Sequence, residues 1–146
     1  MGFRNNLLKR GIMSSDTEVM VRALFGRKQI APVAMTTAAT ITVAALKAGL
    51  ITGTHAAGAT AAYTLPTGTV MDAALTAFLV ANDSFDFTII NLSTALADTI
   101  TLTAATGFTI VGQAIIDSAN ADSEFPSSGT FRVRRTAANT FVAYRL

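Results

Sequence analysis

The sequence contains no cysteine and no tryptophan, a single histidine, and charged residues at only 14% of its 146 positions. Without cysteine, no disulfide can hold the fold and no thiolate is available for catalysis or metal binding. A surface with so few charges would be poorly solvated in an isolated monomer, whereas charged residues are depleted where subunits meet. We therefore expect a homo-oligomer whose Ala-, Thr- and Val-rich faces are buried against neighbouring subunits.

A membrane-spanning or secretory segment is not expected either. Residues 29–46 carry no charge, but they include four threonines, a glutamine and Pro32, whereas a spanning helix needs about 20 predominantly apolar residues. The apolar core of a secretory signal would lie nearer to Met1. We therefore expect a protein that is made and assembled in the cytoplasm.

Positive charge is concentrated near the N-terminus. Residues 1–47 contain seven Lys or Arg against Asp16 and Glu18, whereas residues 48–146 contain four Arg against seven acidic residues. A basic segment of this kind can contact nucleic acid, but its basic pairs are few. A solvated or subunit-contacting arm is the simpler interpretation, and nucleic acid is not an expected partner.

Residues 1–35 are predicted to form an extended or partly helical N-terminal arm. Ser15 and Glu18 match a capping box, and Gly26 would end a short helix. Because two helical turns are not stable alone, the apolar residues of this helix need a surface of the same domain, a sister subunit or another protein. The residues of the arm that we expect to bind a partner are Leu24, Phe25, Arg27 and Lys28.

Residues 36–146 show the alternation that is typical of half-buried strands. In the segment 84–92, Phe85, Phe87 and Ile89 share one face, with Asp86 and Thr88 on the other. The pattern predicts a mainly β domain, a jelly-roll-like β-sandwich with at most short helices. Strands are expected over 40–46, 60–65, 84–92, 99–103, 108–112, 130–135 and 140–146, and a short helix from about residue 69 to 78.

No constellation of residues indicates catalysis, a cofactor or a metal. His55 lies among Gly, Ala and Thr without a partner in a recognisable spacing, and its expected role is structural or solvated. Asp83 is expected to begin a turn, and the remaining acids are scattered rather than paired as a calcium loop or a glycosidase requires. We therefore predict that the protein is not an enzyme, with no catalytic, cofactor-binding or metal-binding residues.

The predicted C-terminal hairpin carries a cationic face. Arg132 and Arg134 alternate with Phe131 and Val133, so that one face of the strand is apolar and the other basic. Such a row can bind phosphate or sulfate groups, pair with acidic residues of a neighbour, or remain solvated. We include Arg132 and Arg134 among the predicted partner-binding residues.

Five segments of the chain together resemble a domain of structural proteins of tailed bacteriophages. They are residues 63–74, 82–91, 99–112, 129–136 and 141–146, so the resemblance covers about residues 38–146 and not the arm. It implies a β-sandwich displayed on a virion that is assembled in the host cytoplasm.

Among such proteins, the small size of the chain favours a capsid decoration (cement) protein. Its implied partners are the major capsid protein and two further copies of itself, in a homotrimer at a local three-fold axis. The alternative is a tail- or fibre-associated structural or receptor-binding module. A carbohydrate-binding tip would show clustered aromatic residues, but the sequence has only two tyrosines and no tryptophan.

Overall fold

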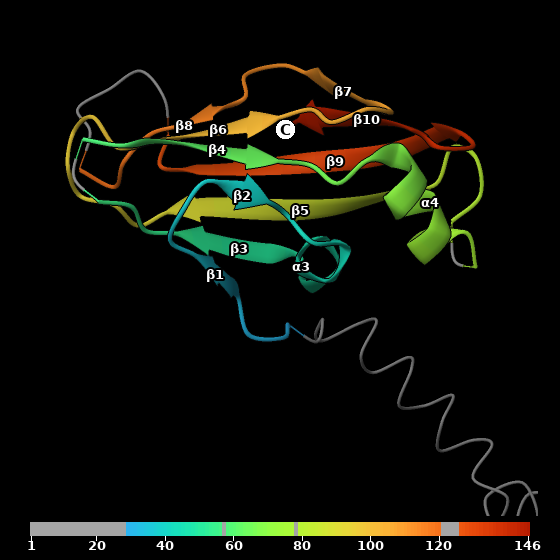
Figure 1. Cartoon of the computed structure of the whole chain (residues 1–146), viewed down its shortest axis with the longest axis horizontal. Helices are drawn as coiled ribbons and strands as arrows, with labels where there is room; N and C mark the ends of the chain where they lie inside the picture. The colour runs from blue at the N-terminus through green and yellow to red at the C-terminus, as the bar shows by residue number, and fades with distance from the viewer. Residues whose placement is uncertain (1–28, 57, 78, 121–125) are drawn as a thin grey trace, which may run out of the picture. The chain divides into compact units, whose positions relative to one another are not determined.

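The computed structural model describes residues 29–56, 58–77, 79–120 and 126–146 (Figure 1). The chain divides into two compact units, Met1–Ile30 and Ala31–Leu146, and the described helices and strands belong to the second. The arm residues that we expect to bind a partner, and the predicted helix that contains two of them, lie outside the described residues.

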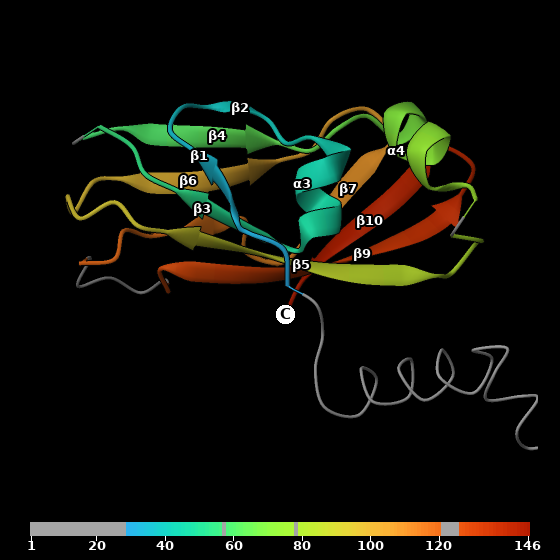
Figure 2. The same cartoon turned by 90° about the horizontal axis from the view of Figure 1, so that it is seen from below.

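The second unit is built from two β-sheets, which Figure 2 shows as layers with β2 and β4 above β5 and β9. The six-stranded sheet contains, in spatial order, β1 (Val33–Met35), β3 (Leu50–Gly53), β5 (Ser84–Asn91), β9 (Ser128–Ala137), β10 (Thr140–Arg145) and β7 (Phe108–Val111). The four-stranded sheet contains β2 (Ala39–Thr40), β4 (Thr60–Thr64), β6 (Thr99–Thr103) and β8 (Ile115–Ile116). The prediction of a mainly β, two-sheet domain is confirmed.

The strand order differs from that of a jelly roll. From β1 to β8 the chain moves to the other sheet after every strand, so that β1, β3 and β5 are parallel neighbours in one sheet and β2, β4 and β6 in the other. Five of the eight pairings between described strands are parallel. Because a jelly roll consists of antiparallel Greek keys, the finer prediction is not confirmed. Alternation in the sequence reports which face of a strand is buried, not which strand lies beside it.

Aromatic residues of the six-stranded sheet form the centre of the core. The rings of Phe87 and Phe131 stack with centroids 5.5 Å apart, and those of Phe108 and Phe141 stack at 5.2 Å. The four-stranded sheet and the two helices cover them with further side chains that are at most 5% exposed, namely Ala45, Leu46, Ala61, Tyr63, Leu65, Met71, Leu75, Ile100, Leu102 and Ile116. The alternation predicted for residues 84–92 is confirmed, since Phe87 and Ile89 are buried.

The prediction of a strand over residues 40–46 is wrong, because helix α3 (Val43–Ala48) occupies most of this segment. The Thr42 hydroxyl accepts a hydrogen bond from the N–H of Ala45 at 3.1 Å, and Gly49 ends the helix with a φ of 80°. Between these signals lie Ala, Leu and Lys, which are strong helix formers. Caps and propensity therefore prevail over the apparent alternation.

The second helix, α4 (Gly68–Leu75), begins close to its predicted position. Its N-cap is Thr67, whose hydroxyl accepts a hydrogen bond from the N–H of Val70 at 3.3 Å, rather than Thr69. Figure 2 shows α3 and α4 toward the end of the four-stranded sheet to which β4 and β6 point. At this end the helices close the space between the two sheets.

The folded unit begins before residue 36, where the predicted domain starts. Val33–Met35, at the end of the predicted arm, forms edge strand β1 and pairs in parallel with residues 51–53 of β3. The unit itself begins at Ala31. Strands β1, β3 and β8 were not predicted, because two to four residues are too few to show an alternating pattern.

Candidate functional site

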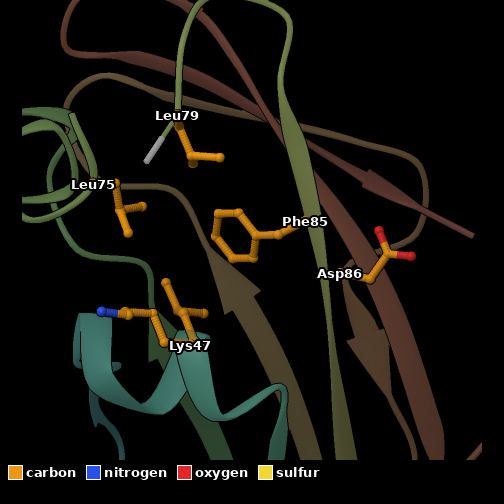
Figure 3. A pocket seen from close by; sticks show the side chains of 6 residues that line it. Lys47, Leu75, Leu79, Phe85 and Asp86 are labelled. Carbon is orange, nitrogen blue, oxygen red and sulfur yellow. The ribbon is translucent and has the colours of Figure 1, made fainter. Parts of the chain in front are cut away.

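An apolar pocket of about 280 Å³ opens between α3, α4 and the beginning of β5 (Figure 3). Four apolar residues and two charged ones line it, namely Leu46, Lys47, Leu75, Leu79, Phe85 and Asp86. Figure 3 shows Asp86 on the opposite side of β5 from Phe85, directed away from the pocket. The pocket is slightly smaller than typical sites for drug-sized ligands, and Lys47 and Asp86 are the two charged residues of its lining. Its chemistry suits the burial of one apolar side chain or a similarly small apolar group.

The cationic face of β9 lies on the outer side of the six-stranded sheet, as the sequence predicts. Phe131 and Val133 are fully buried, whereas Arg132 points outward. Arg132 donates from Nε and Nη2 to the two oxygens of Asp86, both at 2.8 Å. This hydrogen bonding to Asp86 raises the pKa of Arg132. The structure thus brings together a predicted site residue and an acid that the sequence analysis did not connect with it.

A second ion pair lies near the opposite face of β9 and is well shielded. Arg135 donates to the carboxylate of Asp72 at 2.7 and 3.0 Å, and the backbone N–H of Asn139 donates to the same carboxylate at 2.8 Å. These bonds join α4 to the turn between β9 and β10. Backbones approach closely here, since a Cβ at Gly68 would lie 1.9 Å from the carbonyl oxygen of Asn139. The role of this cluster is to fix the end of the domain that carries the pocket.

The hydrogen bonds from Arg135 and from the Asn139 N–H lower the pKa of Asp72. A lowered folded-state pKa contributes stability that is fully present above the unfolded pKa of an aspartate, about 3.9. This contribution is lost as the pH falls below that value and through the lower pKa of the folded state. We therefore expect the free energy of unfolding to fall below about pH 4, and Asp72→Asn to make this fall shallower and to lower stability at neutral pH. Urea unfolding from pH 2.5 to 7 measures both. Asp86→Asn, which breaks the more exposed pair, is the control, and an equal effect of the two variants contradicts the prediction.

His55 contacts the buried side chain of Tyr63. The hydroxyl of Tyr63 donates to the carbonyl oxygen of Met35 at 3.2 Å and lies 2.9 Å from Nε2 of His55. The backbone N–H of His55 donates to the Ser93 hydroxyl at 2.8 Å. Burial raises the pKa of Tyr63 to about 12, so that the phenol is neutral near pH 7. These bonds connect β1, β4 and the loop after β5, and form a structural junction.

Two further acidic residues, Asp98 and Asp83, also bind backbone groups. The carboxylate of Asp98, which is 1% exposed, accepts hydrogen bonds from the N–H groups of Gly58 at 2.5 Å and Ala59 at 3.0 Å. Asp83 accepts from the N–H of Val80 at 2.9 Å and stabilises the turn at Asn82, where φ is 76°. A turn is present here as predicted, but Asp83 closes it rather than beginning it, because its backbone N–H donates to the carbonyl oxygen of Val80 at 3.1 Å.

Two kinds of feature are absent from the part of the chain that the structure describes. Within it, no group of three or more His, Cys, Asp or Glu side chains is placed to hold a metal ion. None of its helices has the length and apolar character needed to cross a membrane.

Comparison of the chain with known proteins finds no matching family model, no similar curated protein and no similar solved structure. A functional assignment therefore depends on the residues and on their geometry.

Proposed function

We propose that this protein is a capsid decoration protein, which binds the outer surface of an assembled bacteriophage head and stabilises it. The resemblance of residues 38–146 to structural proteins of tailed bacteriophages supports the proposal. On this proposal the major capsid protein is its partner, and its location is the virion, after assembly in the host cytoplasm.

The observation that carries the proposal is an exposed face of helix α4 that bears no charge. On α4, the exposed residues Thr69, Val70, Ala73 and Ala74 present a face without charge. Other large apolar side chains are also exposed, with Val80 66% and Leu96 69% accessible. Surfaces of this composition are suited to burial against other subunits.

Stabilisation of the head follows from mass action. A protein that binds the assembled shell, and not its dissociated subunits, shifts the equilibrium toward the shell. We propose that the binding unit is a homotrimer, because symmetric closure at a local three-fold axis gives each copy the same contacts. The uncharged face of α4 is available for contacts within such a trimer or with the shell.

The proposal predicts saturable binding to heads that lack this protein. Purified protein is incubated with such heads and sedimented, and heat-induced release of DNA is then followed. We expect a fixed number of copies per head, and release of DNA at a higher temperature than in undecorated heads. Unassembled capsid protein and isolated tails are the controls. Binding to tails but not to heads would support the tail-associated alternative and refute the proposal.

A further inference from the structure

The outer face of the six-stranded sheet carries a second cation beside the Asp86–Arg132 pair. In the register of β5, β9 and β10, Arg134 lies between Ser84 and Val142, while Arg132 lies between Asp86 and Tyr144. Arg134 is therefore one row along the sheet from the ion pair. Its two lateral neighbours, Ser84 and Val142, carry no charge.

The hydrogen-bonding capacity of Arg134 is not used within the described part of the chain. Both carboxylate oxygens of Asp86 are engaged by Arg132 at 2.8 Å. The Nε of Arg134 is shielded from solvent and has no hydrogen-bond partner. A guanidinium without an internal partner keeps N–H donors in a planar arrangement that matches the two oxygens of a carboxylate. Arg134 as a whole is half-buried, so part of its side chain remains open to a partner.

We infer that this face, which we call the Arg134 face and define as Ser84, Arg132, Arg134, Val142 and Tyr144, docks an acidic protein surface. A carboxylate of the partner binds the guanidinium of Arg134, and the half-buried Val142 and Tyr144 supply apolar contact beside it. Arg and Tyr are the residue types enriched at the energetic centres of interfaces. The Asp86–Arg132 pair holds Arg132 in the sheet, so Arg134 is the residue that discriminates for negative charge.

The identification of the partner as the head shell rests on the proposed function, whereas the chemistry of the Arg134 face does not. Charge complementarity is the basis of the inference, since a neutral partner would bury the guanidinium of Arg134 without a counter-charge. The Arg134 face is separate from the pocket, which opens on the other side of β5.

The test measures binding of a fluorescent glutamate decamer to the full chain by anisotropy at low salt. We expect saturable binding that Arg134→Gln weakens by at least about tenfold. Lys47→Gln, which removes one positive charge from α3, is the matched control and should leave the affinity within about twofold. Circular dichroism and thermal melting check that both variants are folded.

Three results overturn the inference: no saturable binding of the peptide by the folded wild type, equal affinities of Arg134→Gln and wild type, or equal losses in the two variants. Tighter binding of a ten-nucleotide single-stranded DNA, lost in Arg134→Gln, also overturns it, in favour of nucleic acid.

The same proteins are then tested on heads. Wild type that binds the peptide but not heads refutes the proposed function and leaves the acidic docking surface intact. Decoration of heads together with unchanged peptide binding by Arg134→Gln refutes only the docking surface.

Discussion

Deletion of residues 1–30 is expected to give a folded, trimeric domain that no longer attaches to heads. The compact unit begins at Ala31, so the truncated chain retains β1 and its pairing with β3. The deleted segment contains the residues that the sequence predicts to bind the shell, in which Phe25 would anchor in a pocket of the partner and the two cations would pair with acidic residues or carbonyl groups. Sedimentation velocity, circular dichroism and co-sedimentation with heads measure assembly, folding and attachment.

Deletion of residues 1–14 is the matched control for this prediction. It removes the polar beginning of the chain but keeps the capping-box residues Ser15 and Glu18 and the four predicted contact residues. We expect this shorter deletion to retain attachment. If the 1–30 deletion is instead unfolded or monomeric, the arm belongs to the trimer and the attachment role is refuted.

Substitution of Phe131 by alanine is expected to destabilise the domain by about 3–5 kcal/mol, because the cavity left by the ring cannot be filled by its neighbours. Phe131 is fully buried, stacks on Phe87, and supports the guanidinium of Arg145, whose carbon lies 5.0 Å from the ring centroid. The loss is a large fraction of the stability of a typical domain. Urea unfolding monitored by circular dichroism measures it.

Val111→Ala is the control for this core substitution. Val111 is 46% exposed on edge strand β7, so its truncation should change the free energy of unfolding by no more than about 0.5 kcal/mol. Similar small losses in both variants would contradict the assignment of Phe131 to the centre of the core.

The strands with clear alternation were predictable from the sequence, but their neighbours were not. Ser84–Asn91 and the hairpin of β9 and β10 carry the alternation over six or more residues, and their buried faces are as expected. The parallel pairing of β3 with β5 joins segments separated by helix α4 and the strand before it. Such pairings depend on how the whole chain packs, because no local pattern encodes the partner of a strand.

The candidate sites, like the strands, were predictable only in part: the sequence indicated which face the arginines occupy, but not which residues lie beside them. Alternation placed Arg132 and Arg134 on one outward face, but the carboxylate that engages Arg132 lies 46 residues away in the sequence. The pocket combines α3, α4 and β5, and α3 was predicted as a strand, so the pocket was not foreseen. The cap at Thr42 and the glycine at 49 are the local signals that identify this helix.

The central claim, that this protein decorates the outside of a phage head, is tested most directly by an electron cryomicroscopy map of the particle that carries the chain. The proposal predicts density that fits the two-sheet domain on the outer surface of the head, in groups of three around local three-fold axes. Density for this domain in the tail or its fibres, or absence of the chain from purified particles, would contradict the claim.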